Sequence, residues 1–183
     1  MQNNLLDGKT IVVTGGATGI GQAFALTSAA YGARVMIADM NPADETLDLI
    51  KGNGGEASYV QTDVSDAHSA QSMAEATIKW AGRIDGLINN AAYFREVKLT
   101  PFEEISNEIW DRIFDVNVKG IWQCCKGVMP AMREGGGGSI INISSVVAVA
   151  GQPGYLHYVA TKGAVLSMTC LLYTSPSPRD GLL

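Results

Sequence analysis

A glycine-rich loop lies between a short apolar run and a helical pattern near the start of the chain. The run is Thr10–Thr14, and the loop that follows has glycine at positions 15, 16, 19 and 21. Glycines let the backbone approach a pyrophosphate closely, and a following helix offers unpaired N–H groups and the positive end of its dipole. The spacing Gly15-x-x-x-Gly19-x-Gly21 differs from the commoner G-x-G-x-x-G, so a tight turn without a ligand is an alternative. The loop therefore predicts a strand–turn–helix unit and suggests a phosphate site.

Apolar runs alternate with helical patterns along the rest of the chain. Strands are predicted at residues 10–14, 34–39, 57–61, 86–89 and 139–143, and helices at about 19–31, 41 onward, 65–80, 106–133 and 154–169. Continuous apolar strands separated by long helices are typical of a parallel sheet covered on both faces, so we expect an α/β fold. Right-handed crossovers then give a Rossmann-like, doubly wound parallel sheet. Asn41 and Ser65 are the predicted N-caps of two of these helices.

Composition fits one globular domain and excludes several classes of partner. With 183 residues, 46% of them hydrophobic and 17% charged, the chain can bury one sizeable core. The net charge of −5 argues against nucleic acid as the main partner, because phosphate backbones select basic surfaces. The chain shows no signal-peptide pattern and no apolar run long enough to span a membrane. Its three cysteines form no disulfide framework, and no metal-binding pattern is visible, so a reducing cytoplasm fits best.

Asp39 ends the second predicted strand, about 20 residues after the glycine loop, where dinucleotide-binding folds place an acidic residue. A carboxylate there can bind the adenosine ribose hydroxyls and would repel a 2′-phosphate. Neither the glycine loop nor the segment immediately after Asp39 contains an arginine or lysine that could receive such a phosphate. The sequence therefore predicts NAD in preference to NADP.

The best candidate for a general acid or base is Tyr158, which lies one helical turn before Lys162 and downstream of Ser145. Positions i and i+4 share a helix face, so we expect the ammonium group to lie near the phenol. A nearby positive charge favours the phenolate and would lower the tyrosine pKa from about 10 towards the working pH. A surface tyrosine beside a solvated lysine is the alternative that this spacing alone leaves open.

Motifs spread over the chain resemble those of the short-chain dehydrogenase/reductase family, in the same order and at the usual spacing. They are Thr14 to Gly21, Asn89-Asn90-Ala91-Ala92, Asn117, Ser144-Ser145 and Tyr158-x-x-x-Lys162. The resemblance covers residues 7–169 and departs from the family's pattern at Ala92, where glycine is usual. It implies an NAD(P)-dependent oxidoreductase that interconverts a secondary alcohol and a ketone. It also implies a homodimer or homotetramer, assembled through the helices that begin near residues 106 and 155.

The resemblance implies a role for each matched residue. Tyr158 would transfer the proton, Ser145 would hydrogen-bond the substrate oxygen, and Lys162 would bind the nicotinamide ribose and lower the Tyr158 pKa. Asn117 would hold a water molecule that relays protons from Lys162 to solvent. The residues expected at the cofactor are Thr14, Gly15, Thr18, Gly19, Ile20, Gly21, Asp39, Asp63, Val64 and Asn90, together with Tyr158 and Lys162.

Apolar and aromatic side chains follow these motifs and predict a mainly hydrophobic pocket for a small alcohol or ketone. They are Tyr93, Phe94, Val147 and Tyr155. Two other functions stay open. One is a non-catalytic module that senses NAD, since a fold does not fix a function, although the complete set of Ser145, Tyr158 and Lys162 counts against it. The other is NADPH-dependent reduction of a 3-oxoacyl thioester, which Asp39 disfavours.

The last residues differ in character from the rest of the chain. Residues 174–178 hold two prolines and two serines, which cannot continue the helix predicted before them. Residues 170–180 also match, codon for codon, one reading frame of a transposase sequencing adapter. We therefore expect one truncated domain over residues 1–169 and a non-native tail from Cys170 to Leu183. The sixth and seventh strands of the family and its substrate loop would then be absent.

Overall fold

The computed structural model describes residues 4–174, with side chains up to Leu172. The strands are β1 (Thr10–Thr14), β2 (Arg34–Asp39), β3 (Glu56–Gln61), β4 (Gly86–Asn89) and β5 (Ser139–Asn142). The helices are α1 (Gly19–Ala30), α2 (Asp44–Gly52), α3 (Ala67–Ala81), α4 (Asn107–Phe114), α5 (Gly120–Glu134), α6 (Val147–Ala150) and α7 (Leu156–Thr174). A 3₁₀ turn, η1 (Phe102–Glu104), precedes α4, and a π-helical turn, η2 (Asp115–Lys119), joins α4 to α5.

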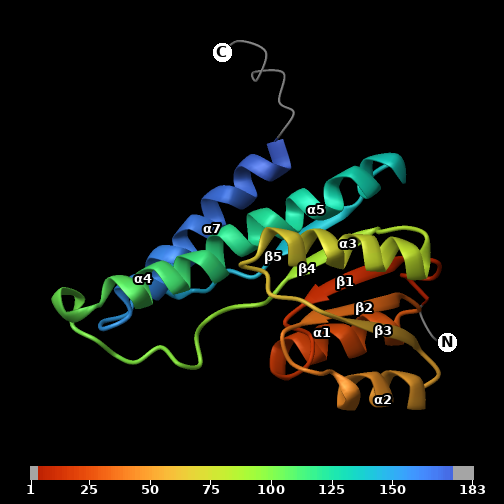
Figure 1. The fold of residues 1–183 in the computed structure, drawn as a ribbon, viewed down its shortest axis with the longest axis horizontal. Coiled ribbons are helices and arrows are strands. Elements are labelled where there is room, and N and C mark those ends of the chain that lie inside the picture. Colours follow the sequence, from red (N-terminus) through yellow and green to blue (C-terminus); the bar gives the residue numbers. More distant parts are fainter. Residues whose placement is uncertain (1–3, 175–183) are drawn as a thin grey trace, which may run out of the picture.

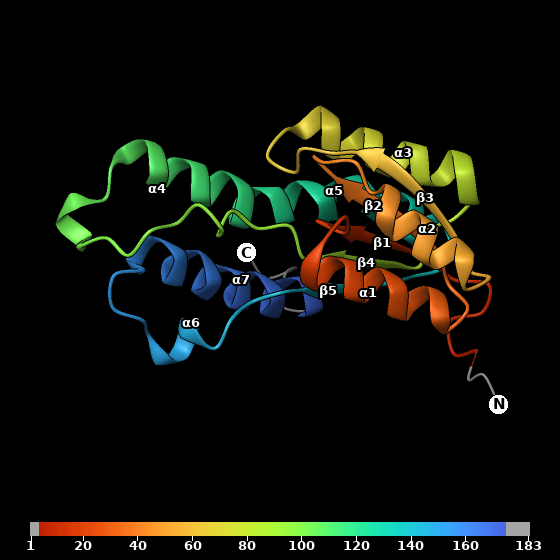
Figure 2. The same ribbon diagram turned by 90° about the horizontal axis from the view of Figure 1, so that it is seen from below.

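The strands form one parallel sheet in the order β3-β2-β1-β4-β5, which confirms the predicted α/β, doubly wound architecture. Figures 1 and 2 show α1 and α2 on one face of the sheet and α3, α5 and α7 on the other. The strand order reverses between β1 and β4, because the chain builds one half of the sheet before it crosses to the other. In folds of this kind, ligands bind at that point, outside the carboxyl ends of the strands.

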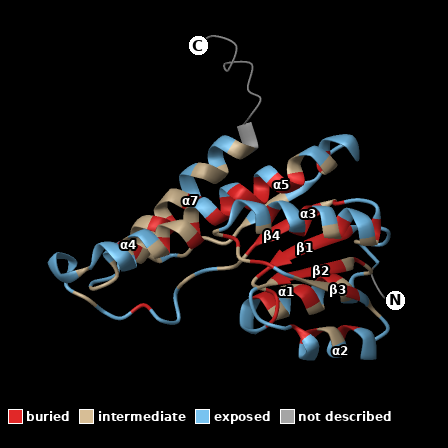
Figure 3. Cartoon of the chain, viewed as in Figure 1, coloured by how far each residue is buried: buried red, intermediate tan, exposed pale blue. Residues whose placement is uncertain are grey.

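Alternate residues of the central strands face opposite layers of the core. Val12 and Met36 pack on the side of α3 and α5, whereas Val13 and Ile37 pack on the side of α1 and α2. Figure 3 shows that the buried residues concentrate in β1 and β2 and in the inner sides of the helices. This two-sided burial explains why the strands read as continuous apolar runs.

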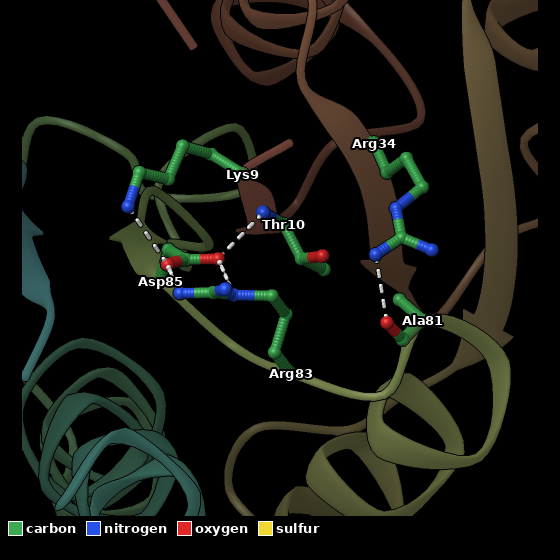
Figure 4. Close-up of polar contacts among 6 residues, drawn as sticks. All are labelled: Lys9, Thr10, Arg34, Ala81, Arg83 and Asp85. Atoms are coloured by element: carbon green, nitrogen blue, oxygen red, sulfur yellow. Dashed lines mark hydrogen bonds and ion pairs between the residues drawn. The ribbon is translucent and has the colours of Figure 1, made fainter. Parts of the chain in front are cut away.

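An ionic clasp of Lys9, Arg83 and Asp85 joins the start of β1 to the segment before β4 (Figure 4). The buried Asp85 carboxylate accepts hydrogen bonds from the Thr10 backbone N–H at 2.9 Å, from the Lys9 ammonium at 3.2 Å and from the Arg83 guanidinium. Burial alone would raise the pKa of Asp85, but these hydrogen bonds outweigh it and lower the pKa below its ordinary value. The clasp stabilises the end of the sheet opposite the glycine loop.

Both predicted helix caps are wrong. The N-cap of α2 is Ala43, and Asn41 lies outside the helix with its backbone N–H bound to the Asp39 carboxylate. Helix α3 is capped by Asp66. The neighbouring Ser65 does not cap the helix, because its hydroxyl donates to another carboxylate before the helix begins.

The long helix predicted at residues 106–133 is present but not uniform. The turn η2 interrupts it, since the backbone hydrogen bonds there span five residues and not four. Such turns occur frequently at functional sites, and this one holds Asn117.

Helix α7 extends past Thr169, where we expect the native part of the sequence to stop. It continues through Thr174, and Leu172 packs against the core on the α5 side of the sheet. The remainder of the predicted tail, residues 175–183, lies outside the described residues.

Candidate active site

The glycine loop joins β1 to α1 and closes tightly on itself. Gly15 has φ +65°, and a Cβ there would lie 2.9 Å from the Ala91 Cα. Gly21 lies in the first turn of α1, where a Cβ would overlap the Gly15 carbonyl oxygen. Gly19 has φ +62° with open space around it. Without side chains at these points, the loop leaves the N-terminus of α1 open to an anion.

Thr14 and Asn90 fasten this loop to the end of β4. Thr14 Oγ1 accepts from the backbone N–H groups of Asn90 and Ala91, at 3.0 and 3.1 Å. The Asn90 amide nitrogen donates to the carbonyl oxygens of Thr14 and Gly15, at 3.1 and 3.0 Å. Both residues are predicted cofactor contacts, and in the structure their side chains shape the loop that would receive the cofactor.

A cavity of about 340 Å³ lies beside the glycine loop, at the carboxyl ends of β1, β2 and β4. The predicted cofactor residues that line it are Gly15, Thr18, Asp39, Asp63, Val64 and Asn90. Its lining does not include Thr14, Gly19, Ile20 or Gly21, and Ile20 is 67% exposed on α1. Met40, Thr62, Arg95 and Arg112 also line the cavity, although no sequence motif predicted them.

Asp39 holds a fixed position at the end of β2. One carboxylate oxygen accepts from the Ala17 N–H in the glycine loop at 3.0 Å, and the other accepts from the Asn41 N–H at 3.0 Å. The carboxylate therefore lies between the glycine loop and the connection to α2, on the wall of the cavity. This is the position from which an acidic residue binds ribose hydroxyls.

Asp63 also lines the cavity, near Arg112 of α4. Its carboxylate accepts from the Ser65 backbone N–H at 2.9 Å and from the Ser65 hydroxyl at 2.6 Å. Burial alone would raise the pKa of Asp63, but the hydrogen bonds from Ser65 and the nearby Arg112 charge lower it. Arg112 donates to Ser65 Oγ at 3.0 Å, so this arginine is attached to the segment that follows the predicted cofactor residues Asp63 and Val64.

Ser145, Tyr158 and Lys162 come together where the end of β5 meets α7. The Ser145 hydroxyl lies near enough to the Tyr158 phenol to lower its pKa. Lys162 is only 4% exposed; its ammonium donates to the Ile143 carbonyl at 2.7 Å and lies 5.7 Å from the centre of the Tyr158 ring. Ser144 points differently, because its hydroxyl donates to the Lys162 backbone carbonyl at 2.8 Å. The structure thus brings together the three residues predicted to carry the chemistry.

The pKa of Tyr158 is shifted in the direction opposite to the one that the sequence predicts. The sequence predicts that Lys162 lowers the pKa, but burial raises it above its ordinary value, and the nearby Ser145 hydroxyl offsets this only in part. Burial also lowers the pKa of Lys162 to about 8. The expectation is wrong because the lysine ammonium is itself desolvated and is bound to a backbone carbonyl, not to the phenol.

Asn117 lies in the π turn and is 1% exposed. Its side-chain oxygen accepts from the Tyr93 N–H at 2.7 Å, and its amide nitrogen donates to the Tyr93 carbonyl at 3.3 Å and to Thr161 Oγ1 at 3.2 Å. Thr161 in turn donates to the Tyr158 carbonyl at 2.8 Å. The Asn117 side chain therefore clamps the connection between β4 and α4 against α7. Thr161 was not predicted, although its position three residues after Tyr158 places it near the same face of the helix.

Comparisons with known proteins agree with this arrangement. The sequence profile of a family described as short chain dehydrogenase matches residues 9–178. An uncharacterised oxidoreductase of Methylorubrum extorquens is 39% identical over 177 residues, which cover 95% of this chain and 69% of that protein. A 3-oxoacyl-(acyl-carrier-protein) reductase of Thermotoga maritima is 38% identical over a match that covers 90% of this chain and 66% of that protein. A cyclopentanol dehydrogenase of a Comamonas species is 35% identical over a match that covers 88% of this chain and 64% of that protein.

Solved structures of a dehydrogenase and a reductase share the fold of this chain. A structure described as a short-chain alcohol dehydrogenase of Sinorhizobium meliloti superposes with a TM-score of 0.85 at 31% identity, over 90% of this chain and 65% of that one. Levodione reductase superposes with a TM-score of 0.85 at 29% identity, over 90% of this chain and 64% of that one. The chain therefore spans about two thirds of the length of the proteins it matches. Within residues 4–174, none of the helices combines the length and the apolar character needed to cross a membrane.

Proposed function

Because the chain belongs to the short-chain dehydrogenase family, whose members are oxidoreductases, we propose that it forms the catalytic part of an NAD-dependent enzyme that interconverts a secondary alcohol and a ketone. The observation that carries this proposal is the convergence of Ser145, Tyr158 and Lys162, which come from the end of β5 and from α7. The alternative of a solvated surface pair does not fit, since Lys162 is almost fully buried. Such burial of a lysine beside a tyrosine is more typical of a functional site.

The residues at the glycine loop fit a dinucleotide. Gly21 leaves no room for a Cβ, and the adjoining cavity presents Asp39, Asp63 and Val64 at its wall. The dinucleotide would supply or accept the hydride. In our proposal Asp39 binds the adenosine ribose, while Asp63 and Val64 contact the adenine.

Tyr158 would move the proton. In the reducing direction its hydroxyl donates a proton to the carbonyl oxygen of the substrate, and in the oxidising direction its phenolate accepts the proton of the alcohol. Ser145 would donate a hydrogen bond to the same substrate oxygen and stabilise its developing charge. Lys162 would bind the nicotinamide ribose hydroxyls.

Tyr158→Phe tests the catalytic role. We expect turnover to fall by about 10²- to 10⁴-fold, the usual contribution of a general acid or base, while the affinity for NADH stays nearly unchanged. Stopped-flow or steady-state assays would measure turnover, and fluorescence titration would measure NADH binding. Tyr31→Phe is the matched control, because Tyr31 is a half-exposed tyrosine at the end of α1, away from the site.

The outcomes separate the competing functions. If Tyr158→Phe kept full turnover, the phenol would not be the acid or base. If the unaltered protein bound NADH but converted no alcohol or ketone, the non-catalytic NAD-sensing module would replace the enzyme as the better proposal.

Asp39 supports NAD as the preferred cofactor. A 2′-phosphate brought near its carboxylate would be repelled by about 1 kcal/mol or more, so we expect NADH to bind at least about fivefold more tightly than NADPH. Titration of the unaltered protein and of Asp39→Asn with both cofactors measures this preference. Equal affinities in the unaltered protein would contradict it, and Arg95 and Arg112 on the same cavity wall would then be the first residues to test.

The second candidate function is NADPH-dependent reduction of a 3-oxoacyl thioester. The name of the Thermotoga maritima relative favours it, whereas Asp39 counts against it. An enzyme of that kind would prefer NADPH and would reduce acetoacetyl thioesters faster than simple ketones.

A further inference from the structure

Three aromatic rings meet at the proposed catalytic tyrosine. The Phe94 ring lies 4.4 Å from the Tyr158 ring, centre to centre, with an angle of 40° between the planes. Tyr155 completes the cluster, 5.9 Å from Phe94 and 6.4 Å from Tyr158. Figure 2 shows the connection between β4 and α4, which carries Phe94, running beside α7, which carries Tyr158. These separations are those of favourable aromatic pairs.

Phe94 is held in place from both sides along the chain. The Asn117 side chain binds both backbone groups of Tyr93, the preceding residue. On the other side, the Phe94 carbonyl accepts from the N–H of the buried Val97 at 2.9 Å. Phe94 is nevertheless 43% exposed as a residue, so its side chain contacts Tyr158 and still leaves surface that a ligand could reach.

The surroundings of the cluster are uncharged on the side of α6 and α7. Residues 143–156 contain no charged side chain. Val146 and Val149, beside Ser145, are 75% and 78% exposed. An apolar group attached to the reacting carbon would therefore meet hydrocarbon surface on this side, with an aromatic ring as the largest element.

We propose that Phe94 is a specificity-determining residue, whose open ring surface packs against a cyclic group next to the reacting carbon and so favours ring-bearing secondary alcohols and ketones over open-chain ones. This inference rests on the proposed function, because it names the substrate class of the same site. Phe94 acts through contact with the substrate, while the proton transfer stays with Tyr158.

Phe94→Leu tests the proposal, since leucine keeps an apolar side chain but removes the ring. The assay compares 1-phenylethanol with 2-octanol, which have the same number of carbon atoms, in the full-length protein. We expect kcat/KM for 1-phenylethanol to fall roughly 3- to 10-fold and that for 2-octanol to change by less than about twofold. Phe94→Tyr should keep the preference for the ring. Phe102→Leu is the control, because Phe102 is a 72% exposed phenylalanine in η1, in the same connection.

Equal losses for both alcohols, or an unchanged ratio in Phe94→Leu, would overturn the proposal. A second readout separates its failure from failure of the proposed function. If the unaltered protein oxidised neither alcohol, the proposed function would fail, and saturation-transfer NMR would then compare binding of the two alcohols without turnover. Weaker transfer to 1-phenylethanol in Phe94→Leu, with no change for 2-octanol, would still support the role of Phe94, and identical transfer would refute it.

Discussion

At the scale of single residues, burial moves the acidities of Tyr158 and Lys162 in opposite directions. The phenol loses the water that would stabilise its anion, so its pKa is raised, and the ammonium loses the water that would stabilise its cation, so its pKa falls to about 8. Both changes favour the neutral forms. In the chain itself, therefore, Tyr158 is a proton donor at neutral pH and becomes a proton acceptor only in alkaline solution.

We expect the two directions of the reaction to respond oppositely to pH. Oxidation needs the phenolate, and since the pKa of Tyr158 lies above 10.0, kcat/KM for oxidation should keep rising through the alkaline range. Reduction needs the protonated phenol and should fall only as the pH passes the same pKa. Rate profiles measured in both directions would check this. An oxidation rate that levels off near neutral pH would show that Lys162 dominates over burial, as the i, i+4 spacing alone suggests.

Most of the site could be predicted because its residues belong to short motifs with a local signature. Thr161 and Arg112 could not, since each acts through a partner distant in sequence: Thr161 through Asn117, and Arg112 through Ser65. The direction of the Tyr158 pKa shift could not be predicted for the same reason. It depends on desolvation of the phenol, which only the folded chain determines.

At the scale of elements, strands and helices could be predicted better than helix ends. Apolar runs define β1, β2 and β4 because each of these strands is buried on both faces, whereas β3 and β5 have exposed positions. The cap of α3 could not be predicted, because the choice between Ser65 and Asp66 depends on a hydrogen bond from Ser65 to Asp63. Likewise, nothing local distinguishes the π turn, which accompanies the contacts of Asn117 with Tyr93.

The junction of β1 and α1 gives a prediction at this scale. Gly21→Ala should cost roughly 1–3 kcal/mol of unfolding free energy, because the added Cβ would meet the Gly15 carbonyl, and should weaken NADH binding as the loop opens. Gly52→Ala, in α2, is the control: its Cβ would enter open space, so stability should rise by up to about 1 kcal/mol with NADH affinity unchanged. Denaturant unfolding and NADH titration measure both effects. Similar behaviour of the two variants would contradict the close packing of the loop.

At the scale of the whole molecule, the described residues hold both the glycine loop and the Ser145, Tyr158 and Lys162 site on one sheet. We propose that the native part of this sequence ends near Thr169, inside a truncated domain, and that residues 170–183 are adapter-derived. The continuation of α7 through Thr174 is compatible with this origin, since residues 170–174 include neither proline nor glycine and a formed helix propagates easily into such a segment.

Sequencing of the source DNA across the Thr169 codon tests the proposed boundary. We expect the genomic reading frame to differ from the present one from codon 170 onward and to encode further strands. An uninterrupted genomic match through codon 183 would refute the boundary.

The π turn makes this site sensitive to chain length. Because η2 holds one residue more than an α turn, loss of any single residue from it would let regular α-helical bonding run from α4 into the first turns of α5. The extra residue is taken up within the turn, so the faces of α4 and α5 would keep their relative orientation, but the side chains inside the turn would change direction. A deletion that leaves the helix intact would thus break the hydrogen bonds between the Asn117 side chain and the Tyr93 backbone.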